Sequence, residues 1–219
     1  MISLCSSVVI ETLLQSGSEQ VAVACLYCDF QTHKEQSTAH MLGAILKQVA
    51  SGLENIPQEI KAAFKRSRKQ IDGRELESDE ILKLLISSLR TMQRSYICID
   101  ALDEFPREYR PELFKLLVKV TQESPGTRLF LTGRQHIQEE IGRYFTRRVE
   151  IRIKPAEEDI RSYLTARLSN DPFPRAMNQD LREEIFKTIP EKISDMYVTN
   201  FTALCAGTFF HRSFLLTRL

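Results

Sequence analysis

Three short apolar runs along the chain are typical of strands that are buried on both faces of a parallel sheet. They lie at Val21–Tyr27, Tyr96–Ile99 and Arg128–Thr132. A fourth segment, Val149–Ile153, alternates apolar and charged side chains, as an outer strand does when one of its faces meets solvent. The hydrophobic pattern therefore predicts a sheet of four strands.

Between these runs, apolar residues recur every three or four positions, which is the period of an amphipathic helix. Ser78 stands at the start of one such segment, where its hydroxyl is expected to cap the helix. Because helices alternate with strands, we expect an α/β fold with helices on both faces of a parallel sheet. The expected helices are Ile2–Leu14, Thr38–Val49, Gln58–Gln70, 79–92, 111–120, Ile137–Tyr144, Pro155–Leu168, Gln179–Ile189 and Glu191–Met196.

The strand at Tyr96–Ile99 ends abruptly in acidic residues, at Asp100, Asp103 and Glu104. The carboxyl ends of parallel strands form the crevice in which such sheets bind ligands. One aspartate there can hold Mg²⁺ through its water ligands, and a second acid can orient an attacking water toward a γ-phosphate. The alternative is a buried strand that simply ends in a solvated acidic turn.

The sequence YICIDALDE, from Tyr96 to Glu104, resembles the extended Walker B motif of NACHT NTPases, a group of STAND-class P-loop ATPases. Three further segments are similar to the nephrocystin-type N-terminal NACHT modules of filamentous fungi: VACLYCDFQTHKEQSTAHMLGAILKQ, RLFLTGRQHIQEEI and IKPAEEDIRSYL. The similarity extends from the first residues to Met196. It implies the three-layer α/β sandwich of P-loop NTPases, with the strand order 5-1-4-3-2.

The resemblance also implies roles for individual residues. Asp100 would bind the magnesium ion, and Asp103 and Glu104 would be the catalytic acids. Thr132 and Arg134 match the sensor 1 segment, in which the arginine senses the γ-phosphate of the nucleotide. ATP and Mg²⁺ are the cofactors implied, and self-association or binding to other proteins is the implied mode of signalling. Without the resemblance, Arg134 is equally compatible with a surface arginine in a loop between a strand and a helix.

One motif of that family is absent from residues 1–219. A P-loop reads GxxxxGK[ST], and none of the eight glycines precedes a Lys-Ser or Lys-Thr pair. In the family this loop and the first strand come just before a helix like Ile2–Leu14, so the resemblance implies a sequence truncated before or at the Walker A motif. The family's strands 2-3-4-5 would remain, side by side in that order. They correspond here to Val21–Tyr27, Tyr96–Ile99, Arg128–Thr132 and Val149–Ile153. We then expect an open slot between Arg128–Thr132 and Val149–Ile153, where the first strand would lie.

The same absence bears on activity. The lysine and the hydroxyl of a P-loop hold the phosphates and the metal, and such positioning is most of what a protein contributes to phosphoryl transfer. We therefore expect residues 1–219 alone neither to bind nor to hydrolyse ATP efficiently, and whether the chain is an enzyme stays open at this stage.

The predicted organisation has three parts. A partial NACHT core that lacks the P-loop comprises residues 1–154, a helical extension 155–196, and an atypical tail 197–219. The tail has scattered aromatic residues and no sustained helical period. If the tail is foreign to the fold, its deletion should leave the thermal midpoint within a few degrees.

Composition narrows the possible partners and the location. The 30 Lys and Arg residues nearly balance 29 Asp and Glu, for a net charge of +1, so no basic field favours nucleic acid or an acidic membrane surface. The expected helix 58–70 carries a basic run that we expect to be a solvated helix face, with an interaction surface as the alternative: Lys61, Lys65, Arg66, Arg68 and Lys69. No apolar run approaches the roughly 20 residues of a membrane-spanning helix. Five cysteines, an odd number, are typical of reduced thiols, so we expect a cytoplasmic protein.

Cysteine spacing suggests a second kind of site. Cys25 and Cys28, with His33 nearby, have the spacing of a zinc or redox motif. However, no second pair completes such a motif, and both residues lie in or beside a predicted strand. Buried structural thiols are the favoured interpretation for these two residues and for Cys98.

Three functional hypotheses follow. The first is a fragment of a NACHT-type nucleotide-dependent signalling switch. The second, from another class, is a non-enzymatic protein-interaction module that retains the NACHT surface without nucleotide turnover. The third is the product of a degenerate or wrongly bounded gene.

Overall fold

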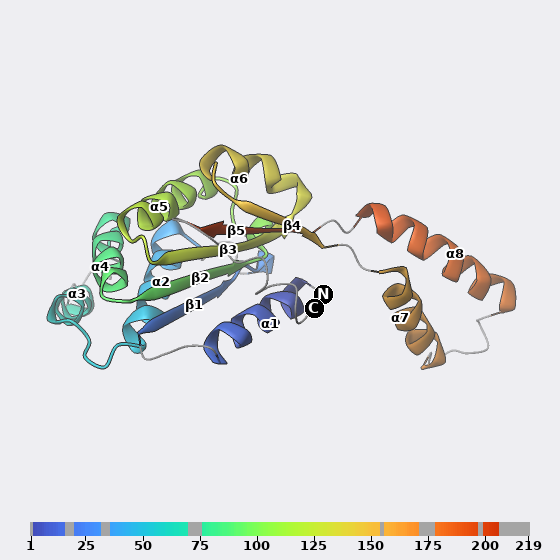
Figure 1. Cartoon of the computed structure of the whole chain (residues 1–219), viewed down its shortest axis with the longest axis horizontal. Coiled ribbons are helices and arrows are strands. Elements are labelled where there is room, and N and C mark those ends of the chain that lie inside the picture. The colour runs from blue at the N-terminus through green and yellow to red at the C-terminus, as the bar shows by residue number, and fades with distance from the viewer. Residues whose placement is uncertain are drawn as a thin grey trace.

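The computed structural model describes residues 2–15, 20–31, 36–69, 76–153, 156–170, 178–196 and 199–205. A five-stranded sheet lies among helices, and helices α7 and α8 stand beside this body (Figure 1). The elements in chain order are α1 (Ile2–Gln15), β1 (Val21–Tyr27), α2 (Thr38–Ser51), α3 (Gln58–Lys69), α4 (Ser78–Arg90), β2 (Arg94–Asp100), η2 (Leu102–Glu104), α5 (Arg110–Glu123), β3 (Thr127–Arg134), η3 (Gln135–Ile137), α6 (Gln138–Tyr144), β4 (Val149–Ile153), α7 (Glu157–Ser169), α8 (Gln179–Met196) and β5 (Thr199–Cys205).

The sheet has the strand order β1-β2-β3-β5-β4. Strands β1, β2 and β3 form a parallel unit, in which Tyr27 lies opposite Asp100 and Ile99 lies opposite Leu131. β2 is thus second from the edge that β1 forms. The predicted direction and place of the Tyr96–Ile99 strand are confirmed, as is the mixed α/β fold class.

The expectation of an open slot between β3 and β4 is wrong, because β5 lies there. β5 runs antiparallel to both neighbours, from Arg128 opposite Cys205 to Arg134 opposite Thr199 on the β3 side. The physical reason is that two facing strand edges carry backbone N–H and C=O groups that need partners, and one inserted strand pairs with both edges. The sheet therefore has five strands rather than the predicted four, and the fifth comes from the tail.

Two helix boundaries also differ from the sequence-based expectation. Gln179–Met196 is one helix with Pro190 inside it, not two pieces, because proline removes one backbone hydrogen bond without necessarily ending a helix. Ser78 is not a cap: α4 begins one residue earlier than expected, with Glu77 at the N-cap position and no side-chain capping bond. Within the described segments, no helix is both long and apolar enough to cross a membrane.

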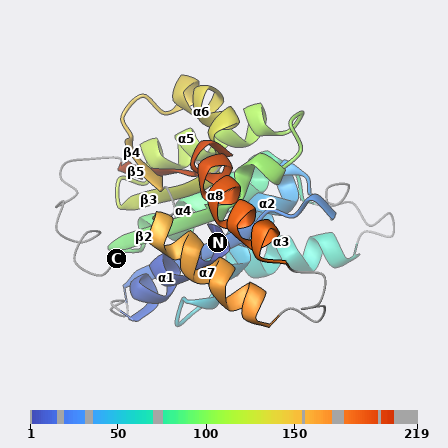
Figure 2. The same cartoon turned by 90° about the vertical axis from the view of Figure 1, so that its right-hand side faces the viewer.

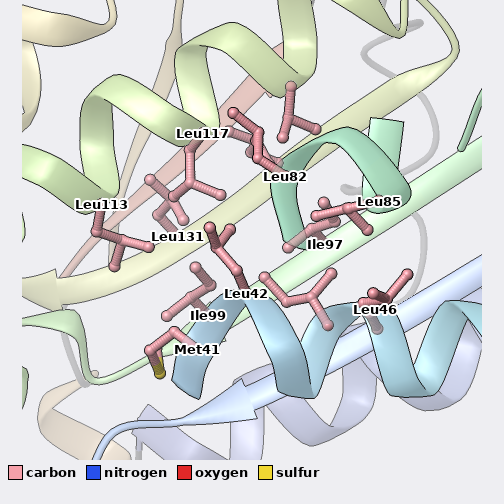
Figure 3. Packing of buried hydrophobic residues seen from close by; sticks show 14 of the residues in the cluster. Met41, Leu42, Leu46, Leu82, Leu85, Ile97, Ile99, Leu113, Leu117 and Leu131 are labelled. Atoms are coloured by element: carbon pink, nitrogen blue, oxygen red, sulfur yellow. The ribbon is translucent and has the colours of Figure 1, made fainter. Parts of the chain in front are cut away.

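The hydrophobic core lies between the parallel strands and helices α2, α4 and α5. Leu42 of α2, Leu85 of α4 and Leu117 of α5 are fully buried and cluster with Ile97 and Ile99 of β2 (Figure 3). Burial of one such side chain is worth about 1.5–3 kcal/mol. This layer therefore holds β2 firmly against the helices, and the end of β2 is fixed in space.

Helix α1 covers the opposite face of the parallel strands. Side chains alternate between the two faces of a strand, so Cys98 and Asp100 lie on the face away from the core residue Ile99. Asp100 accordingly contacts Ser6 of α1. Cys25 of β1 lies opposite Cys98 in the register and shares its face. The α1 side of the sheet thus carries the polar and thiol groups of β1 and β2.

Candidate functional site

The end of β2 turns sharply into the acidic segment. Ala101 adopts the left-handed conformation with φ of 52°, the only positive φ outside glycine among the described residues, and such a conformation is strained for a residue with a Cβ. Two hydrogen bonds hold the turn: the Ala101 N–H donates to Thr132 Oγ1 at 3.0 Å, and the Glu104 N–H donates to the Ala101 carbonyl at 2.8 Å. The turn fixes the positions of Asp100, Asp103 and Glu104 relative to β3.

Asp100 is buried, with 3% of its surface exposed, so its carboxylate needs hydrogen-bond donors. Thr132 Oγ1, from the adjacent strand β3, donates to Asp100 Oδ1 at 2.6 Å. Ser6 Oγ, from α1, donates to the same oxygen. The structure thus brings Asp100 and Thr132 together at neighbouring strand ends, as their places in parallel strands predict. Ser6 joins them from a segment 94 residues away in the sequence.

Arg134, at the end of β3, lies over the two acids of η2. Its backbone N–H donates to Asp103 Oδ1 at 3.1 Å, and its side chain lies 3.4 Å from Asp103 Oδ2 and 4.0 Å from Glu104 Oε1. The side chain of Asp103 is 4% exposed, while the side chain of Arg134 is 65% exposed. A guanidinium anchored on one buried carboxylate and open to solvent on its other side is able to bind a further anion.

Gly133 leaves room for the side chain of Ile137 beside the end of β3. A Cβ at this position would lie 2.5 Å from Ile137 Cδ1 and 3.4 Å from Asp103 Oδ1. The first distance is shorter than carbon atoms tolerate, so a larger residue would force the end of the buried Ile137 side chain to move. The distance to Asp103 is an ordinary van der Waals contact.

Cys28 lies beside Asp100, Asp103 and Glu104, the acidic cluster, and its thiol is poorly suited to act as a ligand or nucleophile there. Its N–H donates to the Asp100 carbonyl at 3.0 Å. Burial, followed by the negative charges of Asp100, Asp103 and Glu104, raises the pKa of the Cys28 thiol to about 12. At neutral pH it is therefore protonated, and thiols bind metals or attack substrates as thiolates.

The zinc or redox pairing of Cys25 with Cys28 is not supported by their positions. Cys28 belongs to the core cluster, whereas Cys25 lies on the α1 side of the sheet, opposite Cys98. His33 falls outside the described residues. In the part of the chain that the structure describes, no group of three or more His, Cys, Asp or Glu residues is arranged to hold a metal ion. Cys28 and Cys98 are buried, as expected, but the expectation is wrong for Cys25, which is only partly buried because β1 is the edge strand of the sheet.

Two features of this region were not predicted from the sequence. Ser6 gives no signal, because a serine in a helix is normally read as solvent-facing. The Cys25–Cys98 pair can be predicted only from the register between β1 and β2, and no local sequence pattern encodes that register. Aligning the two apolar runs by their ends, Tyr27 with Asp100, would have found the pair.

The remaining candidates lie away from the cluster. On α3, the basic residues whose side chains are described are exposed, namely Lys61, Lys65 and Arg66. Arg66 pairs with Glu80 at 2.6 Å. A cavity of about 560 Å³ lies between α7 and α8. It contains none of the candidate residues, and its charged side chains have both signs. The lining residues are Glu157, Ile160, Arg161, Glu183, Phe186, Lys187, Pro190 and Glu191.

Comparison with protein-family models gives a match to the first part of the chain. A protein-family model described as Nephrocystin 3, N-terminal, matches residues 3–134. This range comprises the elements from α1 to β3 and includes every residue of the acidic cluster. No curated protein and no solved structure is detectably similar to the chain.

Proposed function

Because the chain belongs to the nephrocystin 3 N-terminal family, we propose that it is part of a NACHT-type nucleotide-dependent signalling switch and carries the acidic half of its nucleotide site. The observation that supports this proposal most directly is the cluster at the carboxyl ends of β2 and β3. There Asp100 accepts a hydrogen bond from Thr132, and Asp103 and Glu104 lie against Arg134. Ligands of parallel sheets gather at this edge.

Asp100 is the residue proposed to hold Mg²⁺. Its oxygens are the hard ligands that this ion prefers, and Mg²⁺ typically takes only one or two carboxylates from a protein and completes its shell with water and phosphate oxygens. A single buried aspartate at a strand end fits that requirement. The hydroxyls of Ser6 and Thr132 both donate to Oδ1, and they fix the orientation of the carboxylate. When bound, Mg²⁺ would neutralise charge on the phosphates.

The two acids of η2 differ in how far their side chains are exposed to solvent. Both oxygens of Asp103 face Arg134, and its side chain is 4% exposed, so we assign it a positioning role. Glu104 has 34% of its side chain exposed and accepts a bond from the Phe30 N–H at 3.3 Å. Glu104 is therefore the better placed of the two to orient a water molecule for attack on a γ-phosphate.

Arg134 is the proposed sensor. Its guanidinium pairs with Asp103 and Glu104 in this structure, and a terminal phosphate at the strand edge would compete with these carboxylates for it. Movement of Arg134 toward the phosphate would leave Glu104 free for water. The nucleotide state would thereby change the contact between β3 and η2.

Residues 1–219 contain no GxxxxGK[ST] sequence, so we expect these residues alone to bind Mg-ATP no more tightly than the millimolar range. Isothermal titration calorimetry tests this directly. Low-micromolar affinity that Asp100→Asn abolishes would contradict the expectation that a P-loop is needed.

The proposal itself is tested by supplying that motif. In the family resemblance the P-loop strand occupies the position between β3 and β4, where β5 lies here. A strand and loop containing GxxxxGK[ST] should therefore be joined ahead of residue 2 in a chain that ends at Met196. We expect Mg²⁺-dependent ATP binding that Asp100→Asn removes and Asp79→Asn, a change of an exposed aspartate on α4, leaves intact.

A folded graft that binds no nucleotide would overturn the switch proposal and favour the non-enzymatic interaction module. One observation is in keeping with that second candidate. The charged groups of the cluster already satisfy one another, since Arg134 pairs with both acids of η2 and Asp100 accepts two hydroxyl groups.

A further inference from the structure

Cys25 of β1 and Cys98 of β2 lie opposite each other in the register of the two parallel strands. Both are free thiols, and their side chains are neighbours on the same face of the sheet. We propose that this pair is an oxidation site, at which a hydroperoxide converts the two thiols into a disulfide that joins β1 to β2. The proposal does not depend on nucleotide binding.

The backbone geometry suits such a bond. Neighbouring strands of a sheet lie about 4.7–4.9 Å apart, and the Cα atoms of a disulfide are usually about 4.4–6.8 Å apart. Residues opposite each other in parallel strands point to the same face, so both sulfur atoms lie on the side covered by α1. No slip of one strand along the other is needed to bring them together.

A side chain of α2 holds Cys25 in this register. The Cys25 N–H donates to Gln48 Oε1 at 2.8 Å, and Gln48 Nε2 donates to the Cys25 carbonyl at 2.8 Å. These bonds occupy the outward-facing backbone groups of Cys25, because β1 is the edge strand. The position of the Cys25 Cα relative to β2 is therefore fixed from both sides.

Exposure gives the two thiols different parts in the reaction. Cys25 is partly exposed, whereas Cys98 is 2% exposed, so a small oxidant reaches Cys25 first. The Cys25 sulfur attacks the peroxide, the O–O bond breaks, and Cys25 becomes a sulfenic acid as one water leaves. The Cys98 thiol then gives its proton to the hydroxyl group of the sulfenic acid as its sulfur bonds to the Cys25 sulfur, and a second water leaves. In total, two thiols and one hydrogen peroxide give one disulfide and two waters.

Cys28 is the other described cysteine near Cys25, and it serves as the control for the choice of disulfide partner. It is three residues from Cys25, lies on the core face and is 5% exposed. A residue on the opposite face of an extended chain cannot reach the Cys25 sulfur without rotation of the strand. The pair defined by the sheet register, rather than the pair adjacent in sequence, is therefore the reactive one.

The experiment uses the full chain after removal of reductant, treated with a small excess of hydrogen peroxide. Maleimide labelling in denaturant, read by intact mass, is expected to show the loss of two free thiols, restored by dithiothreitol. Tandem mass spectrometry of a digest should identify a Cys25–Cys98 link. Cys28→Ser should leave the loss of two thiols unchanged, and Cys25→Ser should abolish it.

Three results would overturn the proposal: an unchanged thiol count in the wild-type chain, a link that joins Cys25 to Cys5, Cys28 or Cys205, or an undiminished loss of two thiols in Cys25→Ser. The link map is obtained on the wild-type chain, so the test holds even if Cys98→Ser, a change at a buried position, does not fold.

Discussion

Thr132 uses a single hydroxyl group twice: it donates to Asp100 Oδ1 at 2.6 Å and accepts from the Ala101 N–H at 3.0 Å. Both Thr132 and Asp100 are buried. Replacement by valine keeps the shape and removes both bonds, and a buried group left unsatisfied costs about 1–3 kcal/mol. We expect Thr132→Val to lower the free energy of unfolding by at least that amount in urea titrations. Thr132→Ser keeps the hydroxyl and should retain most of the wild-type free energy of unfolding. Equal stability of the two variants would show that the hydroxyl has no structural role.

Ionisation of Cys28 makes the free energy of unfolding depend on pH. Its pKa is raised from the ordinary value of 9.0 to about 12 in the folded chain, so above pH 9 the unfolded state loses the thiol proton before the folded state does. The stabilising contribution is complete below pH 9 and is lost as the pH rises toward 12. The free energy of unfolding should fall by up to about 1.4 kcal/mol per pH unit in this window.

Other groups also titrate there, so the measured quantity is the difference between the wild-type chain and Cys28→Ala across pH 8 to 11. The variant should be less stable at pH 8 because of the cavity it creates, and the gap should narrow as the pH rises. A gap that stays constant would show that Cys28 ionises normally in the folded chain.

At the scale of secondary structure, β5 is the element on which the sheet depends most visibly. It pairs with β3 along Arg128–Arg134 and with all of β4, and each ladder hydrogen bond is worth on the order of 1 kcal/mol net. Deletion of 197–219 should therefore lower the thermal midpoint by roughly 10 °C or more, at about 2–4 °C per kcal/mol for a chain of this size. A chain that ends at Cys205 keeps β5 and is the control.

Circular dichroism melts of these two chains against the full chain make the measurement. If all three midpoints agreed within a few degrees, β5 would contribute nothing to the fold, and the tail would be foreign to it, as its composition first indicated.

The strands that have a strong apolar run of their own were predicted well, and β5, which has none, was not predicted. β1 has the bounds Val21–Tyr27 that its apolar run predicts, and the meeting of Asp100 with Thr132 follows from two parallel strands ending at one edge. β5 was missed because the sequence from Thr199 to Cys205 lacks a strong period of its own and is ordered by its neighbours. Ser6 was missed for a related reason, since its burial depends on a carboxylate far away in the sequence.

At the scale of the whole molecule, the family match ends at Arg134, the last residue of β3. The matched segment thus comprises the parallel unit of three strands with α1, α2, α4 and α5, which contains most of the core. In contrast, α7 packs against α8, and the pair stands apart from the sheet in Figure 1 and crosses in front of the body when the view is turned (Figure 2). This arrangement indicates unequal local stability.

Hydrogen exchange followed by mass spectrometry tests that expectation. Amides of β2, which lies between β1 and β3, should exchange at least tenfold more slowly than those of α7 and α8, because the latter open without disrupting the core. The chain in denaturant gives the reference for full exchange. Equal protection in α8 and β2 would mean that the whole chain unfolds as one cooperative unit.

The interior position of β5 has a consequence for synthesis. β4 ends at Ile153 and β5 ends at Cys205, so at about 5–20 residues per second the ribosome needs several seconds between the two. During that interval β1, β2 and β3 can already assemble around their core, while the facing edges of β3 and β4 have no strand between them. Nascent chains would be most prone to pair with one another at this stage, and binding of a chaperone to the β3 edge would protect them until β5 emerges.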